Sequence, residues 1–186
     1  MRLSQALALM PFLFAAPAMA QEAQCFQTDQ FLVIAQDRTD SAGMEILARA
    51  PARGKIKCEY VERETDFVIN PLGQAGWPDG QPLWFEGLAG KYLVLTRSTG
   101  PDGNIVIMDL AEHQTVVDEA ADNEITVSDD AVTYWMRSEQ GTEDNCPQFE
   151  DFTSNGLGAV IAEEQVFDIA SGEVKSTGEK RCSATQ

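Results

Sequence analysis

Four cysteines constrain the fold of this chain more than any other feature, because all four follow a segment that has the plan of an export signal. An even number of cysteines in an oxidising compartment indicates disulfides, and no two lie close enough for a C-x-x-C motif. We favour Cys25–Cys58 with Cys146–Cys182, since each closes a moderate loop within one end of the chain. The alternative, Cys25–Cys182 with Cys58–Cys146, would join the two ends. In either pairing the cysteines are predicted to be structural.

Residues 1–20 have the three parts of a secretory signal peptide. Arg2 is the single charge, an apolar stretch follows, and small residues precede the expected cleavage after Ala20. The apolar stretch is shorter than the roughly 18 residues of a membrane-spanning helix, and no later segment approaches that length. We therefore expect a soluble domain over residues 21–186, in the periplasm or secreted, with no membrane insertion after signal cleavage.

The chain is strongly acidic, with 13 basic residues against 30 acidic ones and a formal net charge of −17 at pH 7. Phosphate recognition needs clustered Lys and Arg, so no nucleic-acid binding is expected. The acidic runs, of which Asp118 to Glu124 is one, do not follow the spaced Asp-x-Asp-x-Asp-Gly pattern of a calcium loop. We assign no metal site and no cofactor, and we keep a calcium-stabilised module as an alternative.

Short runs rich in Val, Ile, Leu, Thr and aromatic residues recur between turn residues, which indicates β-strands. Tyr92 to Leu95 is apolar on both alternating faces, so this strand should be central in its sheet. Met44 to Ala50 is ambiguous between a strand and a short helix. The pattern predicts an all-β fold, a single domain of antiparallel meanders. The expected strands are Phe31–Ala35, Lys55–Val61, Phe67–Ile69, Tyr92–Arg97, Ile105–Leu110, Thr115–Asp118, Glu124–Val127, Ala131–Arg137, Gln165–Ile169 and Glu173–Ser176.

Turn residues predict two hairpin connections, at Gly100–Asn104 and at Ser171-Gly172. Two longer stretches, Asn70–Pro82 and Ser138–Gly158, do not have the pattern of regular structure. Loops of this length are uncommon without a function or a cross-link. The second has a cross-link if Cys146 pairs with Cys182, whereas the first has none of its own.

Two segments resemble each other. Ile105–Ala111 and Val166–Ala170 are both apolar strands that end in Asp-[Leu/Ile]-Ala and lead through a short turn into another strand. Over residues 92–118 and 131–177 this pattern resembles the blade repeat of β-propeller proteins found among exported bacterial proteins. The chain is too short for a usual propeller of four or more four-stranded blades. The resemblance therefore implies a propeller-like or sandwich-like stack of two or three small antiparallel sheets.

The sequence contains no recognisable catalytic constellation. His113, the single histidine, falls in a predicted hairpin turn, which is a poor position for a Ser-His-Asp or Cys-His site. A pair of carboxylates could in principle support glycoside hydrolysis, but the sequence nominates no pair. We assign no catalytic residue and keep a carboxylate-based hydrolase as an alternative.

Two tryptophans are the candidate partner-binding residues. Trp77 lies inside the Gly- and Pro-rich stretch and Trp84 lies at its exit. Indoles presented by a rigid loop are effective anchors for a protein partner or a sugar ring. The competing interpretation is that both indoles pack inward over the core. Trp135, within an apolar strand, is assigned to the core.

Export, disulfides and the lack of a catalytic pattern together favour a non-catalytic role. The sequence predicts an exported binding or accessory protein of the bacterial cell envelope, for example an inhibitor or an assembly partner. The expected partner is an envelope or extracellular protein.

Overall fold

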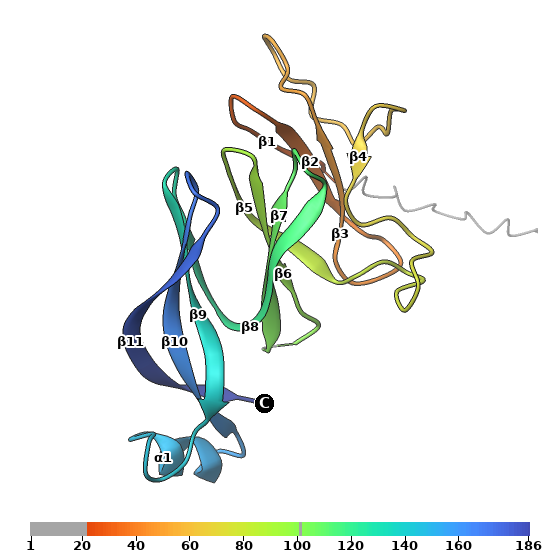
Figure 1. Ribbon diagram of the computed structural model, residues 1–186. Helices are drawn as coiled ribbons and strands as arrows, with labels where there is room; N and C mark the ends of the chain where they lie inside the picture. The colour runs from red at the N-terminus through yellow and green to blue at the C-terminus, as the bar shows by residue number, and fades with distance from the viewer. Residues whose placement is uncertain (1–21, 101) are drawn as a thin grey trace, which may run out of the picture.

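The computed structural model describes residues 22–100 and 102–186, so the predicted signal peptide and Pro101 of the first hairpin lie outside the described residues. Its regular structure is almost all antiparallel strand (Figure 1), which confirms the all-β prediction. One sheet contains β1 (Gln24–Gln27), β2 (Leu32–Asp37), β3 (Met44–Arg49) and β4 (Phe67–Val68). The other contains β5 (Leu83–Ala89), β6 (Tyr92–Arg97), β7 (Gly103–Asp109), β8 (Gln114–Val127), β9 (Ala131–Gln140), β10 (Gly158–Asp168) and β11 (Val174–Thr185), and the short helix α1 (Phe149–Ser154) precedes β10.

Within each sheet the strands pair in chain order, which confirms the predicted antiparallel meanders. In space they form three layers: the four-stranded sheet, the β5–β8 meander in the middle, and the β9–β11 meander on the far side (Figure 1). The described strands form an open, sandwich-like stack and no closed ring of blades. Kinship with propeller proteins stays a prediction.

The core consists of two main apolar clusters, one on each face of the middle layer. The first lies between the four-stranded sheet and β5–β7, and includes Val33, Ile46, Leu93, Leu95 and Val106. The second lies between β6–β8 and the β9–β10 strands, and includes Val94, Ile107, Val132, Tyr134 and Phe167. The middle layer is therefore buried on both sides, although β6 lies only one strand from the edge of its sheet. The two-sided apolar pattern of Tyr92 to Leu95 therefore reflects the stacking of layers, and the prediction that this strand is central in its sheet is wrong.

The seven-stranded sheet becomes two layers because β8 is interrupted by a bulge. Ala121 pairs with Met136 and Ile125 pairs with Tyr134, so three residues of β8 lie opposite one residue of β9. Extra residues on one strand bend it and increase its twist. The two separate strands expected at Thr115–Asp118 and Glu124–Val127 are consequently one long strand, and the β9–β11 meander turns back over β6 and β7.

The two similar segments of the sequence have the same local geometry. Asp109 ends β7 and Asp168 ends β10, and each carboxylate accepts hydrogen bonds from the turn that follows. The next residue, Leu110 or Ile169, donates its N–H at 3.0 Å to the carbonyl just before the preceding strand, that of Lys91 before β6 or that of Asp130 before β9. Such side-chain-to-backbone bonds are the usual reason for aspartate at a tight turn. Both predicted hairpins are present, since β6 pairs with β7 and β10 with β11.

Several expected elements differ from the structure. The segment Lys55–Val61 is not a strand; Ile56 and Tyr60 pack on the outer face of β2 and β3, so their alternation reflects packing on a sheet without pairing at its edge. The ambiguous stretch at Met44 is strand β3. The sequence pattern missed β1 and β5, the first because it is short and polar.

Candidate functional site

The loop before β5 presents Trp77 in a fixed turn. Three of its glycines, Gly73, Gly76 and Gly80, have φ angles of 77°, 83° and 79°, which residues with a side chain rarely adopt. The N–H of Trp77 donates to the carbonyl of Gln74 at 3.0 Å, and the N–H of Gly80 donates to the carbonyl of Trp77 at 3.0 Å. The position of the Trp77 backbone is thus set by the loop itself.

The base of this loop is held by the buried side chain of Asn70, which is 2% exposed. Its Nδ2 donates to the carbonyls of Met44 and Gln81 at 3.1 and 2.7 Å, and its Oδ1 accepts from the N–H of Gln81 at 2.8 Å. A guanidinium N–H of Arg38 also donates to the Asn70 carbonyl. A buried amide with its hydrogen bonds satisfied rigidifies its surroundings. The first long loop is therefore held by the hydrogen bonds of a side-chain amide instead of by a disulfide.

Trp84 lies on β5, the edge strand of the seven-stranded sheet. Its indole Nε1 donates to the carbonyl of Ser98 at 3.0 Å, which fixes the orientation of the ring. Trp84 is 36% exposed and Trp77 is 42% exposed, so neither indole is enclosed in the core. Trp135 is half-buried, and its ring is covered by the guanidinium of Arg181 at 4.2 Å.

The two exposed tryptophans border adjoining shallow hollows. The hollow beside Trp84 has a volume of about 470 Å³ and the one beside Trp77 about 220 Å³. Ala42 and Thr99 line both hollows, so the two form one continuous surface. We call it the tryptophan surface, and it consists of Ser41, Ala42, Trp77, Pro78, Asp79, Gly80, Pro82, Trp84, Glu86, Thr96, Ser98, Thr99, Gly100 and Asn123.

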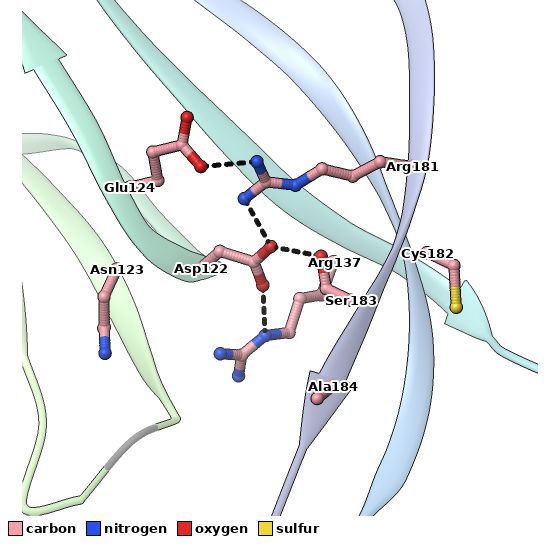
Figure 2. Close-up of a pocket in the computed structure, with 8 residues that line it drawn as sticks. All are labelled: Asp122, Asn123, Glu124, Arg137, Arg181, Cys182, Ser183 and Ala184. Carbon is pink, nitrogen blue, oxygen red and sulfur yellow. Dashed lines mark hydrogen bonds and ion pairs between the residues drawn. The ribbon is translucent and has the colours of Figure 1, made fainter. Parts of the chain in front are cut away.

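A second polar hollow, of about 450 Å³, lies at the β8 bulge and shares Asn123 with the tryptophan surface (Figure 2). Its centre is Asp122, which accepts hydrogen bonds from Arg137 Nε at 3.1 Å, Arg181 at 2.9 Å and Ser183 Oγ at 2.6 Å. Burial opposes ionisation of Asp122, but these three hydrogen bonds outweigh it and hold the pKa of its carboxyl below the usual value. Arg181 also pairs with Glu124 at 2.5 Å.

Five charged residues form the Asp122 cluster, and their charges are paired with one another: Asp102, Asp122, Glu124, Arg137 and Arg181. Arg137 bridges Asp122 and Asp102, and Arg181 bridges Asp122 and Glu124. The cluster joins the last strand, β11, to the bulge of β8. Its geometry supports a structural role, in which guanidinium and carboxylate groups hold the C-terminal meander together.

Three aspartates of the described residues are poor candidates for a general acid. Among the described residues, the carboxyl groups with a shifted pKa are Asp109, Asp122 and Asp168, and all three are shifted downward. A general acid in glycoside hydrolysis needs a raised pKa. His113 lies in the predicted turn, with a φ of 53°, and its ring stacks on Phe67 at a centroid distance of 4.1 Å.

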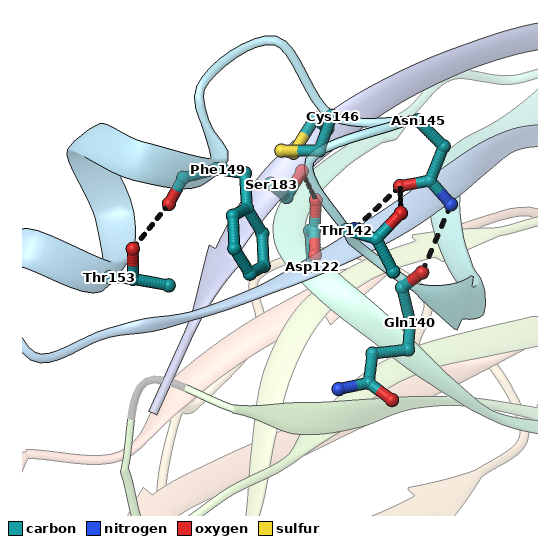
Figure 3. Close-up of a disulfide and its surroundings, with 9 residues drawn as sticks. Asp122, Gln140, Thr142, Asn145, Cys146, Phe149, Thr153 and Ser183 are labelled. Atoms are coloured by element: carbon teal, nitrogen blue, oxygen red, sulfur yellow. Dashed lines mark hydrogen bonds between the residues drawn. A yellow bond between two sulfur atoms is a disulfide. The ribbon is translucent and has the colours of Figure 1, made fainter.

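Both favoured disulfides are present. Cys25 pairs with Cys58 and Cys146 pairs with Cys182, with Cα–Cα distances of 5.7 and 5.3 Å. The ring of Phe149 lies beside Cys146 (Figure 3). In the loop before Cys146, Asn145 accepts a hydrogen bond from the Thr142 N–H and donates one to the Gln140 carbonyl. This second long loop is therefore ordered by a disulfide and by a side-chain amide.

Within the part of the chain that the structure describes, no group of three or more His, Cys, Asp or Glu side chains is placed to hold a metal ion. None of the helices in the same residues has the length and apolar character needed to cross a bilayer.

No protein-family model matches the sequence, and no curated protein or solved structure shows significant similarity to it. The site must therefore be interpreted from its own chemistry.

Sequence reasoning nominated the two tryptophans but missed Glu86, Thr99 and Asn123, which share their surface. No local pattern marks these three, because β5, the β6–β7 hairpin and the β8 bulge meet only in the folded chain.

Proposed function

We propose that this chain is an exported, non-catalytic binding or accessory protein of the bacterial cell envelope, which engages a protein partner through the tryptophan surface. The observation that carries the proposal is the exposure of Trp77 and Trp84 on adjoining hollows. Exposed aromatic side chains in preformed hollows are typical centres of binding energy. Because the Trp77 loop and the Trp84 ring are already fixed by hydrogen bonds, little conformational entropy is lost on binding.

The export part of the proposal is supported by the disulfides and the N-terminal sequence. Two disulfides without a free cysteine in the described residues indicate an oxidising, non-cytoplasmic environment. The first 20 residues supply the signal that would deliver the chain there. Expression of the full chain in a bacterial host should yield a protein that begins at Gln21, as measured by intact mass after osmotic release. A product that retains residues 1–20 would contradict this part.

The binding part is tested by partner recovery with matched variants. The tagged wild type should recover a defined envelope protein from native extract, identified by mass spectrometry and then purified to measure affinity directly. The double variant Trp77→Ala/Trp84→Ala should lose this protein, because the anchors are gone. The control Val116→Ala/Val174→Ala removes side chains of similar exposure, 39% and 38%, outside the tryptophan surface, and should retain it.

Two results would overturn the proposal. The first is unchanged affinity of the purified partner for Trp77→Ala/Trp84→Ala. The second is turnover by the purified protein in a hydrolase panel when no partner is recovered, which would favour the carboxylate-based alternative.

A further inference from the structure

The hydrogen-bond donors of the tryptophan surface are largely committed within the protein. The indole N–H of Trp84 donates to the Ser98 carbonyl, and the hydroxyl of Thr96 donates to Glu86 at 2.9 Å. The hydroxyl of Ser98 donates to backbone carbonyls of its own turn, and that of Ser41 donates to the Asp79 carbonyl at 3.0 Å. What the surface presents to a ligand is therefore chiefly acceptors and aromatic faces.

Two exposed carboxylates supply these acceptors. Glu86 lies at a bulge of β5, and it lines the same hollow as Trp84. Glu86 accepts a single hydrogen bond, from Thr96, and Asp79 accepts none at its carboxylate from the described residues. A carboxylate has about four acceptor positions, so both retain most of their capacity. Neither hollow is lined by a lysine or an arginine of the described chain.

The neighbouring hollow shows how this protein uses the same combination of groups. There the guanidinium of Arg181 lies over the ring of Trp135, 4.2 Å from its centroid, while Asp122 and Glu124 accept its N–H groups. Trp84 with Glu86 repeats the pairing of an indole with a carboxylate, and Asn123 borders both hollows. A cation over an indole with a carboxylate at its edge combines two favourable electrostatic contacts.

We infer that the tryptophan surface binds an arginine- or lysine-bearing segment of a protein partner, with the cationic side chain over Trp84 and its N–H groups donating to Glu86 and Asp79. The inference rests on the proposed function and specifies the chemistry of its partner. The net charge of −17 favours a basic segment at longer range as well. A saccharide fits less well, because sugar hydroxyls need donors as well as acceptors, and the donors of Trp84, Thr96 and Ser98 are used internally.

The test uses a defined probe on the mature protein, residues 21–186. The probe is a short synthetic peptide, acetyl-Gly-Ser-Arg-Gly-Arg-Ser-Gly-amide, and its control replaces both arginines with citrulline, a neutral residue of nearly the same shape. Binding is followed by NMR through the indole N–H signals of Trp77, Trp84 and Trp135. We expect the arginine peptide to shift the Trp77 and Trp84 signals more than that of Trp135, and to bind about tenfold more tightly than the citrulline peptide.

Matched charge variants separate a local effect from general attraction to an acidic protein. Asp79→Asn/Glu86→Gln should weaken the arginine peptide about tenfold, since both acceptors lose their charge. Glu143→Gln/Asp144→Asn removes the same charge from exposed residues outside the tryptophan surface and should change affinity less than twofold. Both variants keep side-chain shape, so circular dichroism should match that of the wild type.

Equal binding of the arginine and citrulline peptides, or equal loss in both charge variants, would overturn the inference. A response of the Trp77 and Trp84 signals to cellohexaose or a chitin oligomer, with none to the arginine peptide, would identify a saccharide surface instead. If Trp77→Ala/Trp84→Ala loses the envelope partner while Asp79→Asn/Glu86→Gln retains full affinity, the proposed function stands and this inference fails. If both variants keep the partner, the proposed function itself fails.

Discussion

Each end of the three-layer stack is cross-linked by one disulfide, but the contacts around the two disulfides differ in chemistry. At each end a disulfide holds an irregular segment against a terminal meander, and the two cross-links span similar separations of 33 and 36 residues. At the N-terminal end the segment after β3 covers an apolar face, where Ile56 and Tyr60 pack on Leu32, Ile34 and Leu47. Burial raises the pKa of Tyr60 to about 12.

At the C-terminal end the capping is weaker and the bonding is more polar. Helix α1 contains no fully buried residue, and its phenylalanines pack on a small cluster around Cys146. The outer strand β11 is mostly exposed and is joined to β8 through the Asp122 cluster. The comparison teaches that a sheet stack can be closed either by burying apolar area or by pairing charges, and the two solutions should respond differently to perturbation.

The largest expected effect comes from removing either disulfide. Cys25→Ala/Cys58→Ala and Cys146→Ala/Cys182→Ala should each lower the free energy of unfolding by about 4 kcal/mol, since the closed loops are nearly equal in length. Urea unfolding measures this cost. Hydrogen exchange should then separate the ends, with α1 losing protection and strands β2 and β3, on which Ile56 packs, retaining most of theirs. Equal loss of protection at both ends would contradict the comparison.

A slightly smaller loss of stability is expected from breaking the buried ion pair under the segment that follows β3. Arg49 contacts Asp66 at 2.8 Å, and their side chains are 8% and 0% exposed. Asp66→Ala leaves a buried guanidinium without its partner and should destabilise the fold by about 3 kcal/mol. The double variant Arg49→Met/Asp66→Leu should recover part of this loss, because it removes both charges. A cost below about 1 kcal/mol for Asp66→Ala would show that water replaces the carboxylate.

The Asp122 cluster should give a smaller, pH-dependent effect at the other end. Asp122→Asn should cost about 2 kcal/mol near neutral pH, because bonds between charged groups are weakened. The folded-state pKa of Asp122 is lowered, so its stabilisation is present above the unfolded pKa of about 3.9 and is lost as the pH falls through the folded value. Wild type should therefore lose more stability than Asp122→Asn between about pH 5 and pH 2. Parallel pH profiles would refute this account.

The smallest effect is expected from chelation. A calcium-stabilised module would lose thermal stability in EDTA. A fold held by its two disulfide-linked ends should melt at the same temperature with and without EDTA. Differential scanning calorimetry on protein purified without chelators makes the comparison. A melting temperature that falls by more than a few degrees in EDTA and is restored by calcium would favour the calcium-stabilised alternative.

Much of this fold could be predicted from the sequence because its determinants are local. Strands such as β6 and β7 have apolar patterns of their own, and Asp109 and Asp168 act within their turns. The favoured disulfides also join neighbouring cysteines along the chain. Lys55–Val61 was predicted wrongly because its alternation is the same whether a segment pairs at a sheet edge or packs on a sheet face.

The candidate site could be predicted only in part. The Trp77 loop has a local signature of glycine and proline, but the exposure of an indole depends on what the rest of the chain places over it. Asn70 bonds to Met44 and Gln81, and Asp122 to Ser183, across sequence separations that no short pattern encodes. The β8 bulge that brings Asn123 next to Trp84 is likewise a consequence of how the layers pack.

The order of the cysteines has a consequence for how the exported chain would mature. Each disulfide joins cysteines that are consecutive in the sequence, Cys25 with Cys58 and Cys146 with Cys182. An oxidase that links thiols in their order of arrival during translocation produces this pairing directly, without reshuffling by an isomerase. On the proposed export route, the first disulfide would close before the middle strands leave the translocation channel, and the second would close only after β11 has followed.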